Sequence, residues 1–268
     1  MSSSSTVGRA ALRREVDARI PNCSLGIAEE LLKVAELLSA DKSLRTALAD
    51  AGQSVESRQA LVRDLFAPKL QAVAVELLSA AVATRWSDSN ELVDAIEELG
   101  ATVAFTAAEA SATLDAVEEE LFLFGRAVEA NPELQMTLTN PALSAEGKTA
   151  IVRELVAAAA TPTTTVLLAH MAANLRGHRV DAAVTNLCNL AAAQRERVVA
   201  QVRVACALDE SQKERLGRAL ARFQGREVRL NITVDPAVLG GASVRLGDDV
   251  IDGTMLTRLT QARRSLVG

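Results

Sequence analysis

The sequence predicts a mostly α-helical protein, in which two tandem small helical bundles precede a small α+β domain. Three observations support this fold class. Ala, Leu, Glu and Arg dominate residues 1–200, where Gly and Pro are sparse, and this composition favours helix. A long segment of the helical part recurs along the chain. The alternation typical of strands first occurs near residue 198.

The composition excludes several classes of function. Of the 268 residues, 49% are apolar, which is enough to bury real cores. Aromatic residues make up 2%, so stacking platforms for single-stranded nucleic acid are not expected. The two His leave little room for metal or acid–base chemistry, and a net charge of −5 does not favour binding to a polyanion. We therefore expect no nucleic-acid partner.

The charge is divided unevenly along the chain. Residues 1–196 carry 17 Lys and Arg against 26 Asp and Glu, a net charge of −9, and residues 197–268 carry 12 against 8, a net charge of +4. Together these give the total of −5. The division indicates two modules with different partners, although two solvated faces would produce the same pattern.

Neither the cysteines nor the most apolar stretch points to export or a membrane span. The three cysteines are widely spaced and form no CxxC pair, which is typical of small buried hydrophobes in a reducing compartment. The N-terminus has no apolar region of the kind that a secretory signal needs. Residues 155–175 lack charged side chains, but Pro162, several Thr and many Ala interrupt or dilute the stretch, so we expect no membrane span.

An internal repeat defines the first two predicted domains. Residues 39–66 align with 129–156 at an offset of 90, and a one-residue insertion then raises the offset to 91, aligning Leu77 with Leu168. This pattern predicts domains over 1–105, 106–196 and 197–268. We expect corresponding leucines and an isoleucine to be buried in both copies: Leu44 and Leu134, Leu48 and Leu138, Leu61 and Ile151, Leu65 and Leu155.

Several short antiparallel helices are expected in each copy. Ser144 is expected to cap a helix, and Asp88-x-x-Glu91 forms a capping-box pattern. Thr106-x-x-Glu109 has the same pattern and is expected to start the first helix of the second copy. The Glu118–Glu120 run is interpreted as a solvated helix face.

The last predicted domain has the element order strand, helix, three strands, helix. The helix over 210–224 follows a capping box at Asp209-x-x-Gln212, the strand Val228–Val234 alternates strictly, and the final helix is expected over 253–266. Its glycines match neither dinucleotide-binding nor P-loop spacing. We expect turn-forming roles for Asp235, Pro236, Gly240, Gly241, Gly247, Asp252 and Gly253.

No catalytic, cofactor-binding or metal site is predicted. His170 and His178 are eight residues apart, but no Cys or carboxylate cluster completes a ligand set. The helix over 163–176 is apolar nearly all round, so it either occupies the centre of a bundle or offers a groove to a partner helix. The candidate partner-binding residues on this helix and off the apolar stripe of an earlier one are Phe122, Leu123, Leu167, Met171 and Leu175.

The C-terminal segment carries a family resemblance. VDPAVLGGASVRLGDDVIDGTMLTRLTQARRSL, residues 234–266, resembles the C-terminal signature of the delta subunit of F-type ATP synthases, whose mitochondrial counterpart is the oligomycin-sensitivity-conferring protein. The stretch from Leu134 to Lys148 is also similar to the family. The resemblance covers about residues 110–268, whereas the additional N-terminal copy is similar to actinobacterial members.

The resemblance implies a non-catalytic stator without cofactors. The helical domain would bind N-terminal helices of alpha subunits of the catalytic head, and the C-terminal domain would hold the C-terminus of the b subunit. The chain would be one component of a hetero-oligomer, peripheral to the cytoplasmic side of the bacterial plasma membrane. The alternatives are a helical adaptor of an unrelated complex and an enzyme with an unrecognised site in the α+β domain.

Overall fold

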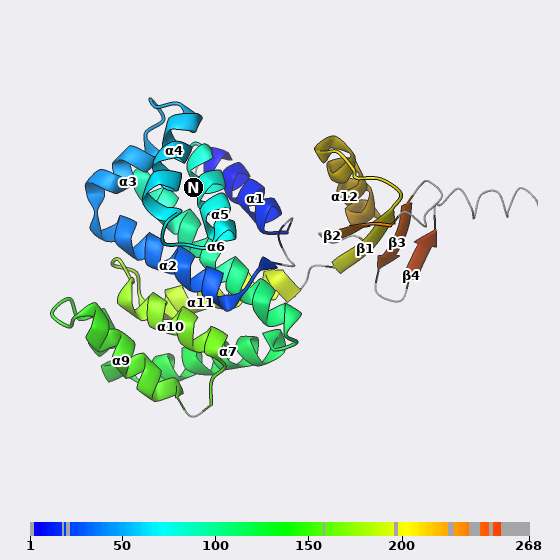
Figure 1. The fold of residues 1–268 in the computed structure, drawn as a ribbon. Helices are drawn as coiled ribbons and strands as arrows, with labels where there is room; N and C mark the ends of the chain where they lie inside the picture. Colours follow the sequence, from blue (N-terminus) through cyan, green and yellow to red (C-terminus); the bar gives the residue numbers. More distant parts are fainter. Residues whose placement is uncertain are drawn as a thin grey trace, which may run out of the picture. The chain divides into compact units, whose positions relative to one another are not determined.

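A computed structural model describes residues 3–17, 19, 22–157, 159–195, 198–224, 228–235, 242–246 and 249–252. The chain divides after Gln194 into two compact units, which we describe separately (Figure 1). The described part of the first unit is all helical, and the described part of the second combines one helix with four strands. The mostly α-helical fold with a small α+β unit at its end is thereby confirmed.

The first bundle is built by the helices α1 to α6. They span Ser3–Asp17, Leu25–Ala40, Lys42–Ala49, Val55–Phe66, Ala72–Ala83 and Ser89–Ala110. Helices α2 and α6 pack along each other, and Gly100 lets them approach closely, because a Cβ atom there would lie 2.9 Å from Leu32 Cδ2. Arg58 is buried and donates a hydrogen bond to the carbonyl of Val82, which ties α4 to the end of α5.

The second bundle contains α7 to α11, shown in green and yellow in Figure 1. These helices span Leu114–Ala130, Pro132–Thr139, Ala145–Val156, Pro162–Ala173 and Val180–Arg195. Leu121, Leu138 and Leu168 are fully buried and belong to the same continuous core as the first bundle. Helix α10 contacts α6, α7 and α9, so it occupies the centre of this bundle.

Helix α6 takes part in both bundles. It contacts α1, α2, α3 and α5 on one side of the repeat and α7 and α10 on the other. The domain boundary expected at 105/106 falls inside this helix, which is continuous from Ser89 to Ala110. The division into two helical domains therefore stays a proposal, in which α6 belongs to both.

Matching backbone motifs recur at an offset of 90. Ser54 caps α4 by accepting a hydrogen bond from Ser57 N at 3.2 Å, and Ser144 caps α9 by accepting one from Gly147 N at 3.1 Å. The turns before these helices also match: Gly52 N donates to Asp50 Oδ1 at 2.8 Å, and Ala142 N donates to Asn140 Oδ1 at 2.9 Å. The predicted cap at Ser144 is confirmed, and these matches support the duplication.

The inserted residue lies later than the sequence alignment predicted. Helices α5 and α10 still match at an offset of 90, so Leu77 corresponds to Leu167 and the pairing with Leu168 is wrong. The extra residue falls in the next turn, which spans 84–88 in the first copy and 174–179 in the second. In that longer turn Arg176 and Gly177 have positive φ angles of 45° and 85°.

The predicted burial of the repeated positions is partly wrong. Leu48 and Leu138 are buried, but Leu65 and Leu155 are exposed. The matching buried positions on α4 and α9 are Val62 and Val152, each three residues before those leucines, and these lie on the inward face of the two helices. The two other predicted pairs are half-buried: Leu44 and Leu134, Leu61 and Ile151. The deviation is the same in both copies.

Three expectations about helix starts and exposed faces had different outcomes. Asp88 caps α6 by accepting a hydrogen bond from Asn90 N, as predicted. Thr106 starts no helix, because it lies buried within α6 and donates a hydrogen bond to the Thr102 carbonyl at 2.8 Å. The interpretation of Glu118–Glu120 as a merely solvated face is wrong for Glu120, which accepts hydrogen bonds from Thr161 N and Oγ1 at 2.9 Å each.

The second unit has a four-stranded sheet in the order β2-β1-β3-β4, with α12 as the connection between β1 and β2. The elements span Val198–Val204, Glu210–Gln224, Val228–Val234, Ala242–Leu246 and Asp249–Asp252. Strands β1 and β2 are parallel, and the other two pairs are antiparallel. The capping box is confirmed, since Gln212 N donates to Asp209 Oδ1 and Asp209 N donates to Gln212 Oε1.

The described core of this unit lies between the sheet and α12. It contains Val202, Val204, Leu220 and Val244, and Leu230 and Ile232 pack against them. Asp235 N donates to the Val204 carbonyl at 2.9 Å, and Asp252 lies in β4 opposite Ser243. The expected final helix over 253–266 and the predicted turn residues Pro236, Gly240, Gly241, Gly247 and Gly253 lie outside the described residues.

Candidate functional site

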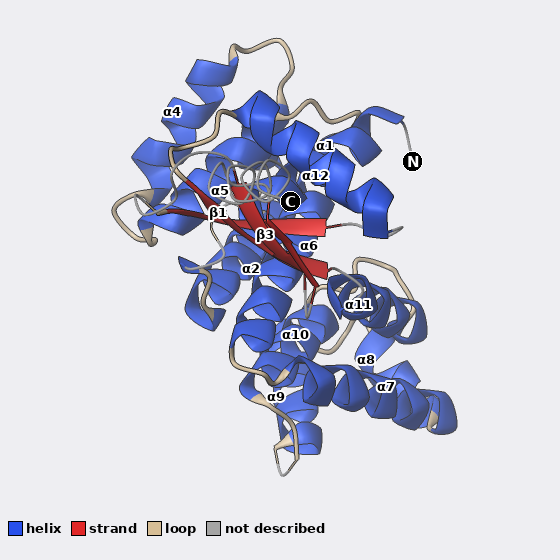
Figure 2. Ribbon diagram, turned by 90° about the vertical axis from the view of Figure 1, so that its right-hand side faces the viewer, coloured by secondary structure: helices blue, strands red, loops and turns tan. Residues whose placement is uncertain are grey.

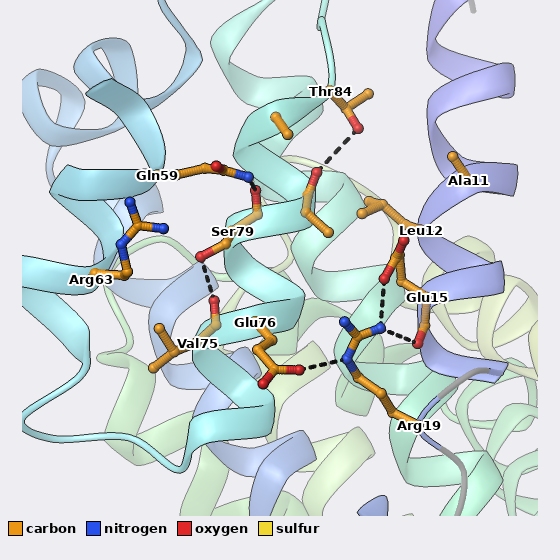
Figure 3. A pocket seen from close by; sticks show the side chains of 12 residues that line it. Ala11, Leu12, Glu15, Arg19, Gln59, Arg63, Val75, Glu76, Ser79 and Thr84 are labelled. Atoms are coloured by element: carbon orange, nitrogen blue, oxygen red, sulfur yellow. Dashed lines mark hydrogen bonds and ion pairs between the residues drawn. The ribbon is translucent and has the colours of Figure 1, made fainter. Parts of the chain in front are cut away.

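An open groove runs over the outward face of α5, between α1 and α4 (Figure 3). Its volume is about 510 Å³. We call it the first-bundle groove, and the residues that line it are Ala11, Leu12, Glu15, Arg19, Gln59, Arg63, Val75, Glu76, Ser79, Ala80, Ala83 and Thr84. It is an elongated surface between helices with no enclosed reaction chamber.

Small side chains form the floor of the groove. Helix α5 turns Leu77 and Leu78 into the core, so Ser79, Ala80 and Ala83 are left on the outward face. The Ser79 hydroxyl donates to the Val75 carbonyl at 2.7 Å, so its hydrogen-bonding need is met within the helix. Because the separation of packed helices depends on the side chains between them, this floor allows another helix to approach closely.

An ionic cluster lies along the α1 side of the groove and consists of Glu15 on α1, Arg19 just after it and Glu76 on α5. Arg19 Nε lies 2.8 Å from Glu76 Oε2, and the Arg19 guanidinium also pairs with Glu15 at 2.5 Å. Burial disfavours the charge on Arg19, but the hydrogen bonds that its guanidinium donates to Glu76 and Glu15 outweigh this effect and raise the Arg19 pKa above its ordinary value. One cation against two carboxylates leaves this cluster with a charge of −1.

The opposite wall is cationic. Gln59 Nε2 donates to the Ser79 carbonyl at 3.2 Å, which fixes α4 against the floor. Arg63, one turn further along α4, is exposed, and within the part of the chain that the structure describes its guanidinium makes no ion pair. The groove therefore suits an amphipathic helix with a narrow apolar ridge, an acidic flank towards Arg63 and a basic flank towards Glu15 and Glu76.

The structure separates the five predicted partner-binding residues into two groups. Leu167, Met171 and Leu175 are only 2%, 8% and 7% exposed and belong to the core, so their assignment to a partner surface is wrong. The physical reason is that neighbouring helices enclose α10, as the central-helix alternative requires. Phe122 and Leu123 on α7 are 61% and 57% exposed, and their role in partner binding stays a prediction.

The first-bundle groove itself was not predicted from the sequence. Its signal is the cluster of small residues on one side of α5, but Ala is frequent throughout the chain and this side looked like part of a uniformly apolar helix. The outward side of α5 depends on where α1 packs, and this position could not be predicted from the sequence.

A second concave surface lies on the second unit. Its apolar part includes Leu208, Leu216, Ala219 and Ala242, and its charged part consists of Arg215, Arg218 and Arg222 on α12. Three guanidinium groups beside an apolar surface suit an acidic amphipathic segment. We call this surface the basic groove.

The described residues contain no group of His, Cys, Asp and Glu suited to a metal ion. Among the helices that the structure describes, none is long and apolar enough to cross a membrane. Cys23 and Cys188 are half-buried, whereas Cys206 is exposed, which contradicts the expectation that all three are buried. Burial raises the pKa of the Cys188 thiol and so disfavours the nucleophilic thiolate form.

Comparison with known proteins assigns the family. The family described as ATP synthase delta (OSCP) subunit matches residues 96–266, which reach from the middle of α6 through the second unit. The chain belongs to the ATP synthase delta (OSCP) family. A chain of this family is a structural subunit of ATP synthase and not a catalytic one.

Curated delta subunits match across both units. ATP synthase subunit delta of Streptomyces griseus is 42% identical over 271 residues, covering 100% of both chains. The delta subunit of Streptomyces avermitilis is 41% identical and covers 96% of this chain and 95% of the relative. The delta subunit of Parafrankia sp. is 43% identical over 90% of this chain and 86% of the relative. The first bundle, most of which precedes the family match, is therefore also similar to actinobacterial delta subunits.

Proposed function

We propose that this chain is the peripheral-stalk subunit that links the catalytic head of the proton-driven ATP synthase to the b subunit. The observation that carries the proposal is the first-bundle groove, whose small-residue floor and oppositely charged walls fit a single amphipathic helix. The N-terminal helix of an alpha subunit is the partner that the family resemblance implies. Binding there would fix the chain to the head.

The basic groove of the second unit is the proposed contact for the C-terminus of the b subunit. Arg215, Arg218 and Arg222 lie beside Leu216 and Ala219, so an acidic amphipathic end would gain both charge pairing and apolar burial. This assignment divides the two partners between the two units, in keeping with their opposite net charges. The chain would then join head and stalk within a hetero-oligomer, peripheral to the cytoplasmic side of the bacterial plasma membrane.

Resistance to rotor torque follows from these two contacts. The central rotor turns while the head makes ATP, and a chain bound to both head and stalk would keep the head from turning with it. Several contacts that act together give an effective affinity far above that of any one of them. Phe122 and Leu123 on α7 would add a further contact to the complex, because two adjacent large apolar side chains are exposed there.

The proposal is tested with charge reversals in the full chain. Arg63→Glu should weaken binding of a peptide copy of the alpha N-terminus by at least tenfold and leave binding of a b C-terminal peptide unchanged. Arg218→Glu should show the reverse pattern. Arg153→Glu is the matched control, since Arg153 is the exposed counterpart of Arg63 on α9 and lies outside the groove. Binding is measured by titration calorimetry at two salt concentrations.

Loss of both peptides in either variant, with circular dichroism unchanged, would contradict the division between the units. Failure of the unmodified chain to bind either peptide would contradict the stator assignment itself.

A further inference from the structure

We infer that the chain holds a single alpha N-terminal helix, in the first-bundle groove. Although the bundle is duplicated, the second copy offers no such groove, because the first bundle closes the corresponding face of the second. This inference rests on the proposed function. It concerns the number and position of the bound helices, not whether a helix binds.

The two faces are compared through the matching helices α5 and α10. Both helices have the same length, and their bounds differ by 90 residues. Their first backbone groups match as well: Gln71 N donates to Glu30 Oε2 and Thr161 N donates to Glu120 Oε2, both at 2.9 Å. The counterparts of the groove floor on α10 are therefore Ala169, His170 and Ala173.

A helix from the other bundle covers part of this second face. Helix α2 contacts α10, and the two lie side by side in both Figure 1 and Figure 2. Ala169 is only 4% exposed, whereas its counterpart Ser79 lines the open groove. In the first bundle, by contrast, the face of α5 between α1 and α4 stays open.

The side chain at the next position also fills the space. His170 replaces Ala80, and its imidazole is 14% exposed with Nε2 3.5 Å from Glu97 Oε1 on α6. Arg176 pairs with the same Glu97 and, at 2.7 Å, with Asp94. This cluster fixes the C-terminal end of α10 to α6. In the first bundle, the corresponding end of α5 carries Ala80, Ala83 and Thr84, which line the open groove.

Two consequences follow for the complex. The second bundle binds no partner helix over α10. In a head with several alpha subunits, one N-terminal helix would therefore lie in the first-bundle groove. The α10 face of the second bundle instead serves to hold the first bundle in place, through α2 and the carboxylates of α6.

The experiment counts bound peptides on the full chain by native mass spectrometry, using a peptide copy of the alpha N-terminus. The unmodified chain should bind one peptide. Ala83→Arg, in the groove floor, should bind none, and the matched variant Ala173→Arg on α10 should still bind one. A photo-crosslinking version of the peptide should label α1, α4 and α5 of the unmodified chain and leave α10 unlabelled, which locates the site without relying on a variant that folds poorly.

Two peptides per unmodified chain, or crosslinks on α10, would overturn the inference while leaving the proposed function intact. Loss of binding in Ala173→Arg with retained binding in Ala83→Arg would place the site on the second bundle. It would overturn both the inference and the assignment of the alpha helix to the first-bundle groove. No binding by the unmodified chain, in contrast, would remove the proposed function on which the inference rests.

Discussion

Glu120 accepts two hydrogen bonds from Thr161, one from its backbone N and one from Oγ1, each at 2.9 Å. The carboxylate thus supplies a long-range acceptor at the N-terminus of α10, where backbone N–H groups have no partner within the helix. Glu30 and Gln71 repeat the arrangement at α5, with distances of 2.9 and 3.1 Å. In each copy, one carboxylate, Glu30 on α2 or Glu120 on α7, fixes the start of the matching helix, α5 or α10.

Removal of this acceptor should destabilise the second bundle. We expect Glu120→Ala to lower the free energy of unfolding by about 1–2 kcal/mol, in the range of a lost helix cap or a charged hydrogen bond. Urea denaturation followed by helical circular dichroism measures the loss. Glu119→Ala is the control, because that neighbouring side chain is exposed, and an equal effect in both variants would show that the Thr161 contact is irrelevant.

Two glycines in helices should respond to alanine in opposite directions. At Gly100 a Cβ atom would lie 2.9 Å from both Cγ and Cδ2 of Leu32, so overpacking of about 1–3 kcal/mol should exceed the helix-propensity gain of about 1 kcal/mol. At Gly217 the nearest atom, Leu230 Cδ1, is 3.7 Å away, so the propensity gain should remain.

Separate probes follow the two units. The fluorescence of Trp86, the single Trp of the chain, reports on the first unit, and amide exchange in α12 reports on the second. If Gly100→Ala raised the free energy of unfolding, α2 and α6 could accommodate a Cβ atom at this position, and the expected overpacking would be contradicted.

The core and surface residues of the second bundle should separate clearly on substitution. Leu167→Ala removes a side chain that is 2% exposed and should cost about 2–5 kcal/mol of unfolding free energy. Phe122→Ala removes one that is 61% exposed and should change the stability of the isolated chain by less than about 0.5 kcal/mol. Thermal unfolding measures both, and a comparable loss in Phe122→Ala would show that its ring is packed.

The cap at Asp41 should make part of the stability depend on pH. Hydrogen bonds from the Ser43 side chain and the Leu44 backbone N–H hold the pKa of Asp41 below its ordinary value. A lowered pKa in the folded state stabilises the fold above the unfolded pKa, near pH 4, and this stabilisation is lost as the pH falls through the folded value. The melting temperature of Asp41→Ala should therefore approach that of the unmodified chain as the pH drops below about 4.

Ser54→Ala is the control for this titration. It removes an uncharged cap of similar geometry, with Ser57 N donating to Ser54 Oγ at 3.2 Å. Its deficit in melting temperature should stay constant over the same range of pH. A deficit of Asp41→Ala that also stays constant would mean that the carboxylate charge contributes nothing to the cap.

Local sequence signals predicted what short segments of chain decide. The caps at Asp88, Ser144 and Asp209 and the strand Val228–Val234 depend on neighbouring residues, and all appear in the structure. Thr106-x-x-Glu109 fits the same capping pattern yet lies inside α6, because packing against several other helices keeps this segment helical and buries Thr106.

Features that depend on packing between distant segments were not predicted. The sequence of α10 was compatible with both a central helix and a partner surface, and only the positions of α6, α7 and α9 decide between them. The first-bundle groove likewise depends on where α1 and α4 lie relative to α5. Glu120 could not be distinguished from Glu118 and Glu119 without the position of Thr161, 41 residues later.

The sharing of α6 has a consequence for how the helical unit comes apart. Helix α6 has 22 residues and is about 33 Å long. Its buried side chains pack in both bundles, so unfolding of either bundle would remove packing contacts from the other. The two copies of the duplication therefore form a single cooperative unit and not two separate domains joined by a linker. A mechanical load applied at one bundle would reach the other through the continuous backbone hydrogen bonds of α6, with no flexible joint between them.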